Sequence, residues 1–149
     1  MIRFERVSRI EEEIKLPTRA TNGSAGYDFY AIEDIELPAG ELTRIPTGVK
    51  CKITPFMVLV LANRSSNPSK RNLILSNGIG VIDSDYYGNI ENDGEIMFEF
   101  YNTSKKAIKL TKGEKIGQGF IVHIIRVEND MIENPDARRA GGFGSTDKK

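Results

Sequence analysis

An acidic and aromatic cluster stands directly behind a short apolar run in the segment Gly80–Tyr86, which reads Gly-Val-Ile-Asp-Ser-Asp-Tyr. Asp83 follows Val81 and Ile82, and a carboxylate beside buried residues is suited to take a proton from water. Tyr86, three residues further on, offers a ring against which a sugar can pack. Taken alone, the segment is equally compatible with a plain hairpin that carries an exposed aspartate.

The last dozen residues form a second group with the chemistry of a binding site. Arg138 and Arg139 precede Phe143, which is surrounded by three glycines and the hydroxyls of Ser145 and Thr146. Glycine lets the backbone approach phosphate oxygens and adopt positive φ, and successive N–H groups bind anions. An arginine adds a fixed positive charge. The pattern indicates a lid over a ligand, and the alternative is a solvated C-terminus with no binding role.

Three shorter polar segments also interrupt apolar runs. Asp28 follows Ala25-Gly26-Tyr27 and could hold a metal-bound water, because Mg²⁺ often keeps its own waters. The run Asn63-Arg64-Ser65-Ser66 follows an apolar stretch and combines a guanidinium, hydroxyls and a helix start, which suits phosphate. Gln118 could hydrogen-bond a phosphate or the attacking water. The structural alternatives are a turn aspartate, a surface arginine beside a capping serine, and a β-turn.

Asn77-Gly78 lies between two short apolar runs, and this dipeptide predicts the tight turn of a β-hairpin. The splayed backbone groups of such a hairpin could contact the edge of a base. Asp83 would then stand at the end of its second strand.

Composition narrows the classes of partner. The 149 residues fit one domain, and Lys+Arg and Asp+Glu are equal at 21 each, so we expect a small anion rather than long nucleic acid as ligand. The lone Cys51 and the lone His123 argue against a disulfide and a zinc cluster. Because the N-terminus lacks a signal-peptide core and no apolar run is long enough for a membrane span, we expect a cytoplasmic protein without a membrane partner.

The elements that must position these residues are mostly strands. Six prolines and fourteen glycines separate short runs rich in β-branched and aromatic residues, which predicts an all-β sandwich, jelly roll or small barrel. One short helix is expected at Ser66–Lys70, with Ser66 as its cap. Residues 1–133 would form the core domain and 134–149 a flexible lid. The expected strands are 2–7, 42–53 with a kink at Thr47-Gly48, 56–62, 73–75, 80–82, 95–101, 107–110 and 119–127.

Taken together and in this order, the polar segments and the tail resemble the five motifs of the trimeric deoxyuridine triphosphatase (dUTPase) family, from about Pro17 to Thr146. The most specific pieces are Gly80–Tyr86 and Gly141–Thr146. The resemblance implies a distorted jelly-roll β-barrel assembled as a homotrimer, with each site built from motifs of different subunits. It also implies Mg²⁺-dependent attack of water on the α-phosphorus of dUTP, which releases dUMP and pyrophosphate.

The same resemblance implies a role for each matching residue. Asp83 would activate water, Asn77 and the backbone near Gly80 would bind the uracil edge, and Tyr86 would exclude a 2′-hydroxyl. Phe143 would cover the uracil within the tail, and Asp28 would place Mg²⁺ through water. The implied phosphate ligands are Arg64, Ser65, Ser66, Gln118 and Arg138, and the remaining implied tail contacts are Gly144 and Ser145.

Several positions depart from the family pattern. Ser66 and Asn72 replace usual glycines, Gly117 replaces an alanine, and Arg139 stands where a glycine is usual. An acidic insertion of about five residues, 89–93, follows the third motif. The alternatives that remain are a dCTP deaminase of related fold, and a dUTP-gated interaction module whose acidic loop near Glu91 binds a regulatory protein.

Overall fold

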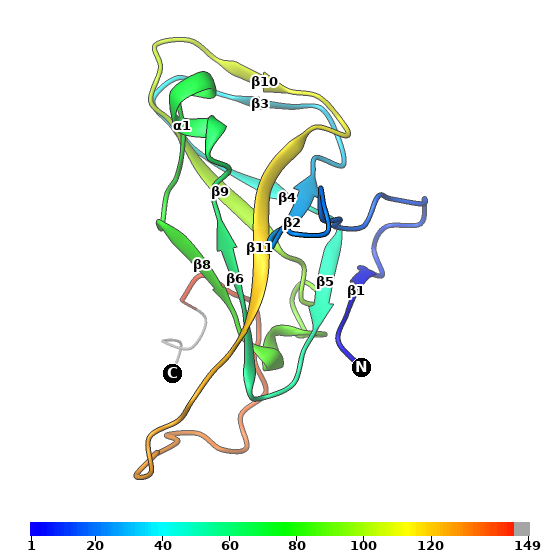
Figure 1. The fold of residues 1–149 in the computed structure, drawn as a ribbon, viewed down its shortest axis with the longest axis vertical. Coiled ribbons are helices and arrows are strands. Elements are labelled where there is room, and N and C mark those ends of the chain that lie inside the picture. The colour runs from blue at the N-terminus through cyan, green and yellow to red at the C-terminus, as the bar shows by residue number, and fades with distance from the viewer. Residues whose placement is uncertain (145–149) are drawn as a thin grey trace.

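The computed structural model describes residues 1–144, and within them the chain forms eleven β-strands, one α-helix and one 3₁₀ turn (Figure 1). The expected all-β character is confirmed. The single helix α1 spans Ser66–Arg71, and the 3₁₀ turn spans Ser84–Tyr86. The strands are β1 Arg3–Arg6, β2 Tyr27–Tyr30, β3 Ile35–Leu37, β4 Leu42–Pro46, β5 Val49–Lys52, β6 Met57–Ala62, β7 Leu73–Leu75, β8 Ile79–Ile82, β9 Met97–Asn102, β10 Ile108–Leu110 and β11 Lys115–His123.

Two larger antiparallel sheets enclose the core. One has the strand order β2-β11-β6-β8 and the other β4-β9-β7, while β1 pairs with β5 and β3 with β10. Aromatic side chains join the two larger sheets: the Phe29 ring on β2 meets the Phe98 ring on β9 edge-to-face, with centroids 5.4 Å apart. Both rings are fully buried, as are Leu59 on β6 and Phe100 on β9. The alternation of apolar and polar residues along β9 therefore places one face of that strand in the core.

The kink expected at Thr47-Gly48 separates β4 from β5. Gly48 has φ +69°, a left-handed value that glycine adopts without strain. The Thr47 hydroxyl donates to the Ile96 carbonyl at 2.6 Å, which fixes the break between the two strands. Two strands were not predicted, β2 and β3, and the last strand begins and ends four residues earlier than expected.

The hairpin predicted at Asn77-Gly78 is wrong. The strand before the turn, β7, pairs with β9, whereas the strand after it, β8, pairs with β6. The turn itself is correct, with Gly78 at φ +71° and its N–H donating to the Leu75 carbonyl at 3.0 Å. The turn therefore carries the chain from one large sheet to the other.

The helix begins at Ser66, the residue predicted to cap it, so the cap lies one residue earlier than predicted. Ser65, rather than Ser66, occupies the N-cap position, and its side chain makes no capping hydrogen bond. At the other end Asn72 is left-handed, with φ 55° and ψ 32°, and its N–H donates to the Asn67 carbonyl. Asparagine tolerates this conformation best after glycine, which explains why it stands where the family has glycine.

Beyond β11 the chain leaves the sheets as an extended arm, drawn in orange in Figure 1, and then returns beside β8. The arm carries exposed apolar side chains among its charged ones: Ile125 is 99% and Met131 92% accessible. No helix among residues 1–144 is long and apolar enough to cross a membrane.

Candidate active site

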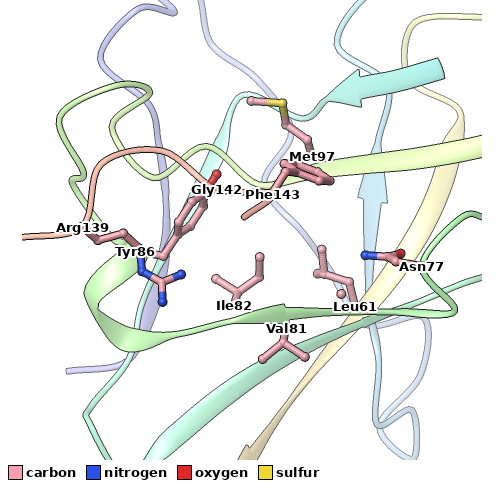
Figure 2. Close-up of a pocket in the computed structure, with 10 residues that line it drawn as sticks. Leu61, Asn77, Val81, Ile82, Tyr86, Met97, Arg139, Gly142 and Phe143 are labelled. Atoms are coloured by element: carbon pink, nitrogen blue, oxygen red, sulfur yellow. The ribbon is translucent and has the colours of Figure 1, made fainter. Parts of the chain in front are cut away.

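A cavity of about 190 Å³ lies between β8 and the returning tail (Figure 2). Its volume is below the roughly 300–1,000 Å³ typical of drug-sized ligands, so it suits one small ring system. Figure 2 shows Asn77 at one end and Tyr86 with Arg139 at the other, with Leu61 and Ile82 between them. The lining residues are Leu61, Asn77, Gly80, Val81, Ile82, Tyr86, Met97, Arg139, Gly142 and Phe143.

Gly80 keeps the middle of the cavity open. It is buried opposite Leu61 in the β6–β8 ladder, and a Cβ atom on it would lie 2.9 Å from the Leu61 Cβ. A side chain at this position would therefore displace Leu61 or fill the cavity. The two residues predicted to contact a base, Asn77 and Gly80, thus line the same cavity.

Tyr86 closes one end of the cavity with its ring. The residue is buried, and its hydroxyl donates to the Glu95 carbonyl at 2.8 Å while accepting from Asn92 Nδ2 at 2.8 Å. Burial raises the pKa of Tyr86, so the phenol keeps the proton that it donates at neutral pH. The ring also lies against Gly142, where a Cβ atom would come 3.0 Å from Tyr86 Cε2.

Asp83 stands between β8 and the 3₁₀ turn, with its carboxylate 47% exposed. Arg139 Nη2 donates to Asp83 Oδ2 at 2.8 Å, and Arg139 Nε lies 3.1 Å from Asp85 Oδ1. Sequence reasoning assigned the tail's anion-binding role to Arg138, which is exposed and forms no ion pair within residues 1–144. In this structure its neighbour Arg139 contacts the acidic pair.

The tail covers the cavity up to the limit of the described residues. Phe143 has φ 52°, and its ring lies over the Arg44 guanidinium, 3.7 Å from the ring centroid to Cζ. Arg44 Nη2 in turn pairs with Glu99 at 3.1 Å. Gly144 is exposed, with φ +91°. The predicted contact Ser145 lies outside the described residues.

The residues predicted to bind phosphate and metal gather elsewhere, where β2, β6 and β11 meet. Asp28 Oδ2 pairs with Lys115 Nζ at 2.6 Å, and Arg64 Nη1 donates to the Lys115 carbonyl at 3.3 Å. Gln118 lies within β11, and its Nε2 donates to the Asn63 carbonyl at 3.0 Å. Ser65 and Ser66 stand beside Arg64 at the start of α1. We call Asp28, Arg64, Ser65, Ser66 and Gln118 the phosphate cluster.

The phosphate cluster and Asp83 lie at opposite ends of the β6–β8 ladder. Ile82, just before Asp83, pairs with Leu59, whereas Arg64 lies two residues beyond Ala62, which pairs with Ile79. At about 3.3 Å per residue the two ends are separated by roughly 15–20 Å along the strands. No residue of the phosphate cluster lines the cavity. One chain therefore does not bring the two predicted halves of the site together.

Asp28 fits an indirect metal contact better than a direct one. Among residues 1–144 no three His, Cys, Asp or Glu side chains are grouped as a metal site, and the Asp28 carboxylate already faces the Lys115 ammonium. Mg²⁺ commonly keeps several waters and takes one or two carboxylates together with substrate phosphates. A single carboxylate acting through water is compatible with that mode.

Sequence reasoning missed several residues that contact the site. Arg44 and Met97 come from β4 and β9, which are distant from the motifs in sequence, and only the pairing of these strands places them beside the tail. Asn89 and Asn92 belong to the acidic insertion, whose role the sequence left open. Arg139 could have been found from the sequence, because an arginine that replaces a usual glycine adds a positive charge next to Arg138, the implied phosphate ligand.

Comparison with known proteins identifies the family to which this fold and sequence belong. The dUTPase family model matches residues 12–147. The deoxyuridine 5′-triphosphate nucleotidohydrolase of Lactococcus lactis is 40% identical over 144 residues, which cover 96% of this chain and 95% of that protein.

Two solved structures agree in fold. The dUTPase crystal structure from Streptococcus mutans superposes with a TM-score of 0.82 at 39% identity, covering 85% of this chain and 98% of that one. A dUTPase of Staphylococcus aureus phage phi11, whose structure concerns a structural Mg(II) ion, gives a TM-score of 0.72 at 21% identity over 92% of this chain and 99% of that one. The expected jelly-roll fold is confirmed. Since both the family model and the Lactococcus relative span nearly the whole sequence, this chain belongs to the dUTPase family.

Proposed function

We propose that this protein hydrolyses dUTP to dUMP and pyrophosphate. The observation that carries the proposal is a cavity lined by Asn77, Gly80 and Tyr86, with Asp83 bonded to another lining residue, Arg139. A small base would occupy the Gly80 end, and its sugar would pack on the Tyr86 ring. The α-phosphorus would then lie toward Asp83.

The proposed chemistry assigns one step to each group. Asp83 accepts a proton from a water molecule, the water oxygen forms a bond to the α-phosphorus, and the bond from that phosphorus to the α,β-bridging oxygen breaks. Pyrophosphate leaves with the bond's electron pair. Arg64, Gln118 and the backbone around Ser65 would stabilise the negative charge on the phosphates. Tyr86, held at its hydroxyl, would leave no room for a 2′-hydroxyl.

Mg²⁺ is the proposed cofactor. Asp28 would hold it through water, and the bound ion would neutralise charge on the triphosphate. Lys115 Nζ lies 2.6 Å from Asp28 Oδ2, so a water of the ion would approach this carboxylate beside the ammonium group.

We also propose that the protein is a homotrimer in which one copy's phosphate cluster completes the site around another copy's Asp83. The separation of the two halves within one chain supports this assembly. The exposed arm supports it too, because Ile125, Met131 and Ile132 leave an apolar surface that a monomer rarely shows to water. The tail would close over the completed site.

A mixing experiment tests the shared site. Asp83→Asn and Arg64→Ala variants are refolded separately and as an equal mixture, and pyrophosphate release from dUTP is measured. Each variant alone should be nearly inactive. With random assortment the mixture should regain about one quarter of the wild-type sites, because some sites then combine an intact Asp83 with an intact Arg64. A mixture no more active than its components would contradict a site shared between copies.

A further inference from the structure

The insertion that follows the third motif folds as a closed loop, 89–94. The Asn89 side chain, 5% exposed, organises it: Oδ1 accepts from the N–H groups of Glu91 at 3.1 Å and Asn92 at 3.2 Å. Asn89 Nδ2 donates to the Tyr86 carbonyl at 3.1 Å. Gly94, with φ +82°, closes the turn at a place where a Cβ atom would lie 2.6 Å from that same carbonyl. The loop is therefore packed on the residue that closes the cavity.

Charged contacts fix the loop to the body of the protein. Lys50 Nζ lies 2.8 Å from Asp93 Oδ2, and the Ser8 N–H donates to the same oxygen at 2.9 Å. Burial opposes ionisation of Asp93, but these hydrogen bonds outweigh it and hold its pKa below the ordinary value. Next to the loop, buried Glu95 accepts from Arg9 at 2.8 and 2.5 Å. The loop is thus held by contacts with the body of the protein.

The tail contacts this loop through its backbone. The Gly141 N–H donates to Asn89 Oδ1 at 3.0 Å, and Gly141 is buried although its neighbours in sequence are exposed or half-buried. A side chain is disfavoured at this position, because φ is +72° and a Cβ atom would lie 2.0 Å from Glu91 Oε2, so that the Glu91 carboxylate would have to move. Gly141 therefore fits the space that Asn89 and Glu91 leave.

The same loop holds Tyr86 from the other side. Asn92 Nδ2 donates to the Tyr86 hydroxyl at 2.8 Å, and Asn92 Oδ1 accepts from the Gly94 N–H at 3.1 Å. Gly142, the residue after the docked glycine, lies against the Tyr86 ring, as Figure 2 shows. The ring is thus enclosed between the loop and the tail.

We propose that loop 89–94 is the docking element of the glycine-rich tail: Asn89 accepts the Gly141 N–H beside Glu91, while Asn92 fixes the Tyr86 ring that the tail covers. The roles of the tail and Tyr86 toward nucleotide rest on the proposed function, but the docking contact does not. The loop contributes positioning residues, since it contacts Tyr86 and the tail and not the reacting atoms.

A fluorescence measurement in the absence of nucleotide tests whether the tail is docked on loop 89–94. The chain has no tryptophan, so Phe143→Trp places a single indole at the tail end of the cavity. Because Phe143 is 53% exposed, the indole in this background should be partly protected from acrylamide relative to free N-acetyltryptophanamide, and Gly141→Ala should abolish that partial protection and lower the anisotropy. Gly40→Ala is the matched control, because Gly40 has φ +69° but open space around its Cβ position. It should leave both readings unchanged.

A second variant shows whether Gly141→Ala acts by breaking the contact between the tail and loop 89–94. In the Gly141→Ala background, Glu91→Ala removes the atoms that the new methyl group would meet and should restore part of the protection. Undiminished protection in Gly141→Ala, or no recovery in the double variant, would overturn the proposal. Because no substrate is present, a protein that fails to hydrolyse dUTP but keeps this pattern would refute the proposed activity and leave the dock standing.

Discussion

The Arg139 guanidinium lies on the Asp83 carboxylate, with Nη2 2.8 Å from Oδ2. Arg139 is a tail residue, and its side chain is only 19% exposed, so the contact is part of the docked tail rather than a passing surface pair. While Asp83 Oδ2 accepts this hydrogen bond, that oxygen faces the guanidinium rather than water. The pair must therefore loosen if Oδ2 is to accept the proton of the attacking water.

Replacing Arg139 tests the consequence of that pairing. Arg139→Ala should lower the KM for dUTP by up to about fivefold, because a half-exposed ion pair of about 0.2–1 kcal/mol no longer competes with the nucleotide. Steady-state kinetics gives the value, and Arg138→Ala serves as the comparison. If Arg139→Ala instead raised KM more than Arg138→Ala does, Arg139 would be the tail's phosphate ligand.

Asp83→Asn separates binding from turnover. The amide keeps the size of the carboxylate but cannot accept the proton of water, so kcat should fall by about 10²–10⁴-fold, the usual contribution of a general base. Calorimetry should still detect dUTP binding. Near-normal turnover would remove Asp83 from the proposed role.

Asn92→Ala probes the selection of the sugar. The substitution removes the hydrogen bond from Asn92 to the Tyr86 hydroxyl and so frees the ring. Because such a bond contributes about 0.5–1.5 kcal/mol, the preference for dUTP over UTP should fall roughly 2- to 10-fold. The ratio of the two kcat/KM values is the measurement, since it cancels general losses of activity. Equal losses toward both nucleotides would show a structural role only.

Removal of everything after Asn134 tests the division between core and tail. This segment forms no helix or strand up to residue 144 and adds little to the core, so the proposed trimer should persist in sedimentation while most activity is lost. Dissociation of the truncated protein would show that the tail belongs to the assembly instead.

How much of this structure the sequence predicts depends on whether a feature is set by neighbouring residues or by contacts between segments far apart in the chain. Strands with a clear apolar pattern, such as β6 and β9, were found almost residue by residue. By contrast, β2 was missed because its polar residue Asp28 and the glycine before it resemble a loop. The turn at Asn77-Gly78 was located, but local residues do not encode whether flanking strands pair with each other or with distant ones.

The site shows the same limit. Asn77, Gly80, Tyr86 and Phe143 were named from their residue types and from the resemblance to the family, and all four line one cavity. The insertion was expected to expose acidic groups, whereas Asn89 is buried and Asp93 pairs with Lys50. Such contacts between segments far apart in sequence follow from the fold, and no spacing rule reveals them.

The pH dependence of stability tests whether Cys51 is packed away from water. Burial alone raises the pKa of this thiol from the ordinary value to about 12. The unfolded thiol then ionises near pH 9 while the folded one does not, so the unfolded state binds fewer protons and stability falls as pH rises from about 9 to about 12. The free energy of unfolding of Cys51→Val, measured with urea, should lack this part of the decline between about pH 9 and pH 12. Identical slopes for the two proteins would mean that the thiol is reached by water.

Pyrophosphate release from dUTP, dTTP, dCTP and UTP, measured with Mg²⁺ and with a chelator, tests the central claim most directly. We predict rapid release from dUTP alone, abolished by the chelator, because the cavity admits a small base at Gly80 and Tyr86 excludes the ribose hydroxyl. Release from UTP at a similar rate would contradict the role of Tyr86. No release from any of the four would contradict the proposed function itself.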